Sequence, residues 1–147
     1  MLGEIFDPNR IKLDLESSTK DDVLEELVEM IAESCSEYDE QELLEAVTLR
    51  ENKMATVVMP GIALPHGYCE AVNGIIGAVG ISRTGIDYDE LDENPVHLFF
   101  LLLMDEAPKE RNLKVFKQLL EMLYSTSFEK ISSMASSKEV YDLLCRF

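Results

Sequence analysis

The sequence predicts an α/β fold: a mixed central sheet flanked by helices on both faces, in a single layered domain. Two stretches with helical apolar spacing precede a group of strand-like segments, and further helical stretches follow them. The segment 96–104, VHLFFLLLM, is apolar at both alternating sets of positions, as a strand covered by helices on both sides is. With 147 residues, 46% of them apolar, the chain has the size of one ordinary domain, so we expect a single domain over residues 1–147.

The first 18 residues predict an irregular or short-strand lead-in. Its strand-like part is an alternation of apolar and charged residues, in which Ile11, Leu13 and Leu15 alternate with Lys12 and Asp14.

Two helices follow the lead-in. Thr19 and Asp22 have the spacing of a capping box, and apolar residues recur behind them at helical intervals, so a helix is predicted to begin at Thr19. A second helix is predicted to open at Asp39 and to run to about Arg50 and Glu51, where the pattern changes.

The middle of the chain predicts strands, and the last third predicts helices. The expected strands are 56–58, 62–64, 74–82 and 96–104. The helix after the loop 105–112 is expected to have an apolar face formed by Leu113, Phe116, Leu119, Leu120 and Leu123. A short helix should begin at Ser127, and Ser136 should cap a last one.

The charge balance excludes two classes of partner. Thirteen Lys and Arg against 29 Asp and Glu give a formal net charge of −16. Nucleic acids and anionic membrane surfaces require basic patches, so neither is expected as a partner. No run reaches the ~18 consecutive apolar residues that span a bilayer, and the N-terminus lacks the pattern of a secretory leader, so we expect no direct membrane insertion and a cytoplasmic location.

The three cysteines, Cys35, Cys69 and Cys145, are widely spaced and odd in number, which favours reduced thiols. Cys69 follows His66 by three residues and invites a metal site or a Cys/His pair. No convincing set of further ligands accompanies it, so no metal site is expected and Cys69 is predicted to be a small, partly buried apolar residue.

The stretch GIALPHG, residues 61–67, contains the strongest candidate for chemistry. Pro65 fixes the entering backbone, and Gly67 removes side-chain bulk beside the His66 ring, which would let another molecule approach it. An imidazole whose unperturbed pKa is ~6.5 is partly neutral at cytoplasmic pH and can act as nucleophile, base or ligand. A histidine in a turn that merely hydrogen-bonds its own loop is the competing interpretation.

A resemblance to a known family bears on this choice. The segment LRENKM, residues 49–54, followed by GIALPHG resembles the active-site region of the type-2 enzyme IIA domains (fructose, mannitol and nitrogen-related) of the bacterial phosphoenolpyruvate-dependent sugar phosphotransferase system. Residues 11–31, 93–104 and 128–144 are similar to the family's opening helix, central strand and closing helices, so the resemblance covers nearly the whole chain.

The resemblance implies a phosphoryl shuttle. The histidine of the family accepts a phosphoryl group from the phosphohistidine of the carrier HPr and passes it to a cysteine of a permease IIB domain. Regulatory members use the same fold. Carried over, that histidine is His66, the partners are an HPr-like carrier and a IIB domain or a regulatory target, and the transfer chemistry needs no organic cofactor and no metal.

Further site residues follow from the same resemblance. Arg50 falls where the family has an arginine near the active site, and a guanidinium there could hold two phosphoryl oxygens. The competing role for Arg50 is that of a cation at a helix C-terminus. Asn112 stands at the position of the family's second histidine and could donate a hydrogen bond without titrating.

The loop before the motif departs from the family pattern. The usual glycine-rich loop is replaced by ATVVMPG, residues 55–61, which adds bulk and removes an N–H at Pro60. Thr56 is retained in this loop, and Thr56 and Gly67 are further candidates for phosphoryl binding or support. This departure, together with Asn112, keeps a second function open: a regulatory binding module of the same fold with weak or absent phosphorylation. His97, the other histidine, is expected to be structural.

Overall fold

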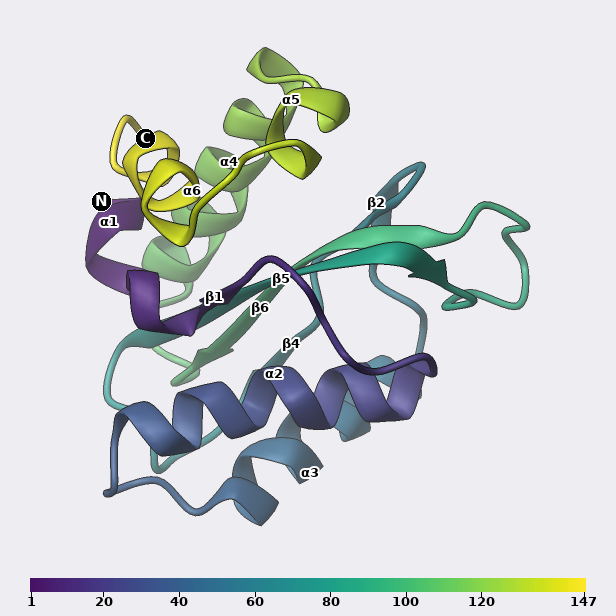
Figure 1. Cartoon of the computed structure of the whole chain (residues 1–147). Coiled ribbons are helices and arrows are strands. Elements are labelled where there is room, and N and C mark those ends of the chain that lie inside the picture. Colours follow the sequence, from purple (N-terminus) through teal and green to yellow (C-terminus); the bar gives the residue numbers. More distant parts are fainter.

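A six-stranded mixed sheet forms the centre of the protein in the computed structural model, which describes all residues 1–147 (Figure 1). The strand order is β1-β5-β6-β3-β2, and β4 also pairs with β6. β5 runs antiparallel to β6, whereas β3 and β4 run parallel to it. The strands are β1 (Ile11–Lys12), β2 (Val57–Met59), β3 (Ile62–Ala63), β4 (His66–Tyr68), β5 (Ile75–Ile86) and β6 (Val96–Met104).

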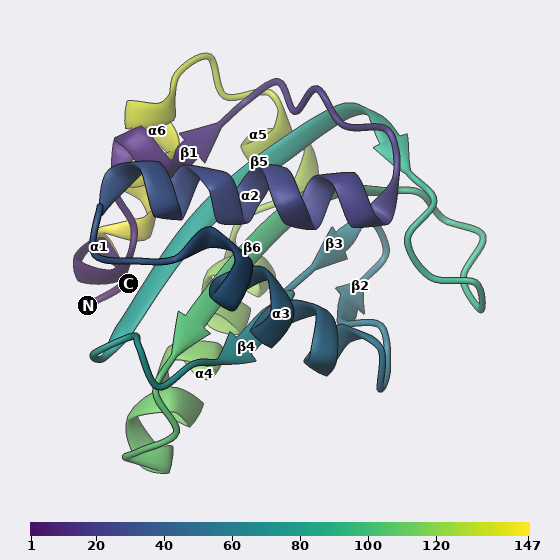
Figure 2. The same cartoon turned by 90° about the horizontal axis from the view of Figure 1, so that it is seen from below.

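Helices cover both faces of the sheet, which confirms the predicted fold class. Figures 1 and 2 show α2 and α3 on one face and α1, α4, α5 and α6 on the other. The helices are α1 (Leu2–Ile5), α2 (Lys20–Ser34), α3 (Glu40–Glu51), α4 (Lys109–Ser125), α5 (Phe128–Ser132) and α6 (Ser137–Leu144), with a 3₁₀ turn at Pro8–Arg10.

β6 separates two hydrophobic cores. Leu98, Phe100, Leu102 and Met104 belong to the core under α4 and α6, whereas Phe99, Leu101 and Leu103 belong to the core under α2 and α3. All seven side chains are fully buried. The continuous apolar run in the sequence therefore reflects a strand with two covered faces.

Four of the predicted helix starts are confirmed by their caps, whereas α4 begins at Lys109, inside the segment 105–112 that was expected to be a loop. The side chain of Thr19 accepts a hydrogen bond from the N–H of Asp22 at 3.2 Å, and that of Asp39 accepts one from Gln41 at 3.0 Å. Ser127 and Ser136 cap the last two helices in the same way. Each cap satisfies one of the N–H groups that the first turn of a helix leaves unpaired.

The structure differs from the sequence-based expectation in several places. A four-residue helix, α1, occupies part of the lead-in. It was not predicted, because four residues are too few to show a helical period in the sequence. β5 extends four residues beyond the expected end at 82. Of the predicted apolar face of α4, only Leu113 is wrong, because it is 68% exposed. Leu119 and Leu123 are buried and Phe116 and Leu120 are partly buried, and Val115 and Met122 complete the face. No helix has the length and apolarity needed to cross a membrane.

Leu101→Ala tests the double-sided role of β6. Removing a fully buried leucine from this strand leaves a cavity, so we expect the free energy of unfolding to fall by about 2–5 kcal/mol. Urea denaturation followed by circular dichroism measures the change. Leu91→Ala, at a side chain that is 96% exposed, is the matched control and should stay within about 0.5 kcal/mol of the parent protein. Equal losses in both variants would contradict this description of the core.

Candidate functional site

His66 is the first residue of β4, not part of a free turn as the sequence suggested. β4 pairs in parallel with β6, with His66 opposite Leu102, and the carbonyl oxygen of Pro65 accepts the N–H of Leu102 at 2.9 Å. The strand has only three residues, so no alternation marks it in the sequence. Pairing with the most buried strand of the protein fixes the backbone that carries the imidazole.

Two aromatic rings and one carbonyl group surround the half-buried His66 ring. The Phe116 ring of α4 lies edge-on to it, with 4.9 Å between centroids, and the Tyr68 ring lies at 6.4 Å. Nδ1 is 3.0 Å from the carbonyl oxygen of Leu64. A carbonyl oxygen can only accept, so Nδ1 carries the proton, and in the neutral ring the lone pair is on Nε2.

The surroundings of the ring favour its neutral form. Burial lowers the pKa of His66 below its ordinary value, and the positive charge of Arg50 lowers it further. The hydrogen bond to Leu64 and the negative charge of Glu51 oppose this shift but do not reverse it. At neutral pH the Nε2 lone pair is therefore available.

Arg50 and His66, which are sixteen positions apart in sequence, are brought into electrostatic contact by the fold. Arg50 lies in the last turn of α3, where its charge also complements the negative end of the helix. Its guanidinium donates from Nη1 to the carbonyl oxygen of Met54 at 3.1 Å, which holds it against the loop that follows α3. Both roles considered from the sequence are thus compatible with its position.

Asn112 lies in the first turn of α4 and is buried. Its Nδ2 donates to the carbonyl oxygen of Asp105 at 2.9 Å, and its Oδ1 accepts from the Arg111 guanidinium at 3.0 Å. The side-chain amide therefore joins the end of β6 to the start of α4. One N–H of Nδ2 has no partner among the hydrogen bonds of the structure.

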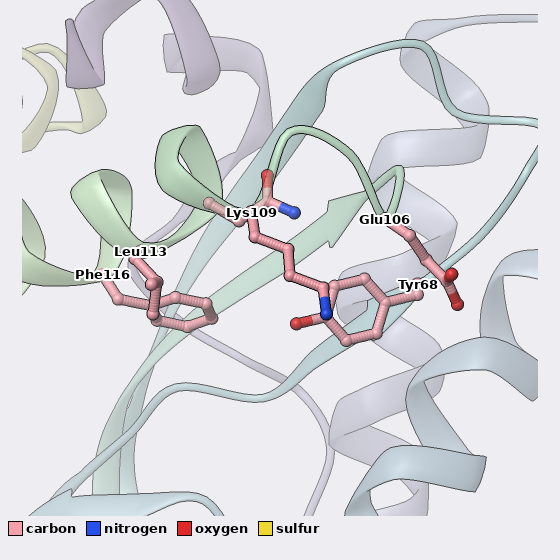
Figure 3. A pocket seen from close by; sticks show the side chains of 6 residues that line it. Tyr68, Glu106, Lys109, Leu113 and Phe116 are labelled. Atoms are coloured by element: carbon pink, nitrogen blue, oxygen red, sulfur yellow. The ribbon is translucent and has the colours of Figure 1, made fainter.

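A pocket of about 390 Å³ opens between β4 and the start of α4 (Figure 3). Phe116, which packs on His66, forms one wall together with Leu113, while Tyr68 lies on the opposite side. The lining is completed by Glu106, Lys109 and Asn112. The pocket thus combines apolar rings with one ammonium group, beside the candidate histidine.

The loop in place of the glycine-rich segment is a β-hairpin. β2 and β3 are joined by Pro60 and Gly61, and Gly61 has φ +86°, as the third residue of a type II turn requires. Thr56, just before β2, is buried, and its hydroxyl donates to the Glu51 carboxylate at 2.8 Å. The single hydroxyl proton of Thr56 is therefore committed to a partner within the protein.

Gly67 has a different role from the one inferred from the sequence. A Cβ on Gly67 would lie 2.6 Å from the carbonyl carbon of Ala46 in α3, so the absence of a side chain lets α3 pack against β4. Because side chains alternate along a strand, this face is opposite to that of His66 and Tyr68. The space beside Gly67 is filled by the helix and gives no access to the imidazole.

The remaining candidates lie outside the site. Nδ1 of His97 is 2.8 Å from the carbonyl oxygen of Ser82, and its ring packs against Phe128, which is a structural arrangement. Cys69 is buried and its thiol is 3.6 Å from a Glu42 oxygen. All three cysteines are free, and no three His, Cys, Asp or Glu side chains are grouped to hold a metal ion.

Sequence reasoning missed several contributors to the site. Tyr68 could have been found, because two positions along a strand from His66 is the same face. Phe116 was predicted only as part of a helix face, and its contact with the imidazole depends on how α4 crosses the sheet. Glu51 was predicted only as the end of a helix, yet its side chain is buried beside Thr56.

Comparison with protein families matches residues 4–146 to the family described as "Phosphoenolpyruvate-dependent sugar phosphotransferase system, EIIA 2". The chain is 31% identical over 138 residues to the fructose-specific EIIABC component of Bacillus subtilis, of which it spans 22%. It is 30% identical over 144 residues to a nitrogen regulatory protein of Pseudomonas aeruginosa, with 97% of this chain and 94% of that protein covered.

Solved structures of similar proteins share the fold. The nitrogen regulatory protein IIA-Ntr of Neisseria meningitidis superposes with a TM-score of 0.88 at 29% identity, over 97% of this chain and 98% of that one. The IIA mannitol structure from Escherichia coli superposes with a TM-score of 0.73 at 23% identity, over 92% and 96% of the two chains.

Gly67→Ala tests the packing of α3 on the strand that carries His66. The added methyl group would overlap the backbone of Ala46, which cannot move independently of α3, so we expect a loss of about 1–3 kcal/mol in unfolding free energy. Urea denaturation measures the loss, and amide chemical shifts in α3 should change. Ala71→Ser, in the exposed loop after β4, is the control. An unfolding free energy within about 0.5 kcal/mol of the parent protein would contradict the packing role.

Proposed function

The chain belongs to the EIIA 2 family of the phosphoenolpyruvate-dependent sugar phosphotransferase system, and we propose that it carries a phosphoryl group on Nε2 of His66. The observation that supports this most directly is the ring itself: neutral, fixed at Nδ1 by the Leu64 carbonyl, and with its lone pair on Nε2. A nucleophilic nitrogen in a defined tautomer is what phosphoryl transfer to histidine requires.

The proposed step is a direct transfer between two imidazoles. The Nε2 lone pair attacks phosphorus, the new N–P bond forms, and the N–P bond of the donor phosphohistidine breaks, with its electron pair returning to the donor nitrogen. The proton on Nδ1 stays in place, and the Leu64 carbonyl oxygen that accepts its hydrogen bond stabilises the positive charge that the phosphorylated ring gains. No organic cofactor or metal takes part in these bond changes.

Positive charge near the ring would stabilise the transferred group. The Arg50 guanidinium is held close by its bond to Met54, and Lys109 lines the pocket beside Phe116. Both cations can interact with phosphoryl oxygens, whose charge is spread in the transition state. Asn112 has one unused N–H for the same purpose, whereas Thr56 would have to give up its bond to Glu51.

The surface beside His66 suits a protein donor and acceptor. Tyr68 is 45% exposed and Leu113 is 68% exposed, and both border the pocket next to the imidazole. Aromatic residues such as tyrosine are enriched in the cores of protein interfaces. We propose an HPr-like carrier as donor, and a IIB domain or a regulatory target as acceptor, in the cytoplasm. Fructose-specific and nitrogen regulatory relatives are equally similar, so both acceptors are proposed.

One observation favours the second function, a regulatory binding module with little phosphorylation. In place of the glycine-rich loop of the family there is a hairpin whose Pro60 has no N–H, and the hydroxyl of Thr56, just before the hairpin, is bonded to Glu51. Such a hairpin offers fewer donors to a phosphoryl group. The neutral, hydrogen-bonded ring of His66 and the positive charge of Arg50 near it make transfer the better-supported function.

Incubation with phosphoenolpyruvate, enzyme I and HPr tests the proposal. We expect one acid-labile, base-stable phosphoryl group that maps to His66 by mass spectrometry. His66→Gln should abolish labelling, and His97→Gln, which alters the only other histidine, should retain it. If the protein stays unlabelled under conditions that label a control IIA domain, the phosphocarrier function is wrong and the binding module takes its place.

The pH dependence of phosphorylation tests the state of the ring. Because the pKa of His66 is lowered, the neutral form persists below pH ~6.5, so the rate should stay level through that pH and fall only at lower pH. Asn112→His introduces a second titrating group in the first turn of α4 and should add a new inflection between about pH 5 and 8. Stopped assays across this range, with the same donor, measure both profiles. Superimposable profiles would show that position 112 does not influence the transfer.

A further inference from the structure

Glu51 is a buried carboxylate in an unfavourable location. It is the last residue of α3, and its side chain is 1% exposed. The C-terminal end of a helix carries partial negative charge, and burial removes the water that would solvate the carboxylate. A carboxylate at this position therefore requires specific donors, and its presence calls for an explanation beyond packing.

Three donors surround the Glu51 carboxylate. Oε1 accepts the backbone N–H of Thr56 at 3.0 Å and lies 3.3 Å from the ammonium nitrogen of Lys20. Oε2 accepts the hydroxyl of Thr56 at 2.8 Å. The same ammonium group lies 4.5 Å from the centre of the Tyr88 ring, which adds a cation–π contact. The carboxylate thus ties the start of α2 and the end of α3 to Thr56.

A line of hydrogen bonds continues from Thr56 to the imidazole. The carbonyl oxygen of Thr56 accepts the N–H of Leu64 at 2.9 Å. The carbonyl oxygen of Leu64 in turn is the partner of Nδ1 of His66 at 3.0 Å. Two bonds from Glu51 hold Thr56, Thr56 holds Leu64, and Leu64 holds the ring.

No other hydrogen bond of the structure orients this ring. β6 fixes the backbone of β4 but makes no hydrogen bond to the ring, whose other neighbours, Phe116 and Tyr68, contact it by packing alone. The loop 52–55, which Glu51 closes by binding Thr56, also supplies the Met54 carbonyl that accepts from Arg50. A displacement of Thr56 would therefore reach both the His66 ring and Arg50, whose charge acts on that ring.

We propose that Glu51 is a positioning residue for His66: by holding Thr56 through its N–H and its hydroxyl, it sets the Leu64 carbonyl that selects the Nδ1–H tautomer. The inference rests on the proposed phosphocarrier function for its consequence, but its structural content does not depend on transfer taking place. Misplacement of a reacting group by about 1 Å costs up to about a hundredfold in rate. Loss of this restraint should therefore affect transfer without removing any group that contacts phosphorus.

Three variants separate positioning from charge. Glu51→Ala removes both hydrogen bonds between the Glu51 carboxylate and Thr56 and should let the loop 52–55 and Thr56 move. Thr56→Val removes the hydroxyl but keeps the N–H, so its effect should be in the same direction and smaller. Glu51→Gln keeps an oxygen that can accept the Thr56 N–H, so it should rescue the position while removing the charge. Glu45→Gln, on the exposed face of the same helix, is the matched control.

The tautomer of His66 is the primary measurement, by ¹⁵N NMR of the imidazole in protein labelled on histidine, with urea denaturation as the check on folding. We expect a defined Nδ1–H form in the parent protein, in Glu51→Gln and in Glu45→Gln. In Glu51→Ala the two nitrogen shifts should move toward each other as the second tautomer becomes populated. The rate of phosphorylation by HPr should fall in that variant by about tenfold or more.

The outcome of each measurement is decisive on its own. Parent-like nitrogen shifts in a folded Glu51→Ala would overturn the inference, and if that variant does not fold, parent-like shifts in Thr56→Val would do so. If the tautomer responds as expected but the parent protein accepts no phosphoryl group, the positioning role stands and the phosphocarrier function fails. If Glu51→Gln shifts the tautomer as far as Glu51→Ala does, the effect is one of charge and the inference is wrong.

Discussion

Burial of β6 on both faces is the constraint from which the rest of the structure follows. A strand whose alternate side chains enter two separate cores must be covered by helices on both sides, and this fixes α2 and α3 on one face of the sheet and α4 and α6 on the other. The same strand pairs with β3, β4 and β5, so it fixes the position of the backbone that carries His66. The site is therefore located by an almost completely buried strand, although its own strand has only three residues.

The side chains around His66 act on it from two directions. From α4, Phe116 supplies apolar surface against the ring, and burial of this kind disfavours the charged form and lowers the pKa of His66. From α3, Arg50 and Glu51 bring opposite charges near it, and the helix can approach this closely only because Gly67 has no side chain. Gly67 and the end of α3 are thus coupled, because the close packing that Gly67 allows determines how strongly the charges of Arg50 and Glu51 act on His66. This coupling explains why the residues of the motif cannot be assigned roles one at a time.

Much of this arrangement could be predicted from residues that act locally. Helix starts could be predicted at Thr19, Asp39, Ser127 and Ser136, because the side chain of each cap accepts a hydrogen bond from a nearby backbone N–H. The segment VHLFFLLLM predicts a strand covered on both faces, because every position of such a strand is apolar. Contacts between distant segments could not be predicted. Neither the filling of the space at Gly67 by α3 nor the exposure of Leu113 has a local signal, because both depend on how helices cross the sheet. His66 was identified through the resemblance to a known family, whereas its tautomer and its neutral state could be inferred only from the three-dimensional structure.

The partner of Nδ1 is a main-chain oxygen, and this has a consequence for the tolerance of the site to mutation. Every amino acid at position 64 supplies a carbonyl, so no substitution there deletes the acceptor, whereas a side-chain acceptor could be lost in a single change. Sequence drift can then alter the hairpin and position 112 while the tautomer persists. The site is instead sensitive to substitutions that move the backbone at position 64. The side chains that hold this backbone make no hydrogen bond to the imidazole and are easily mistaken for ordinary structure.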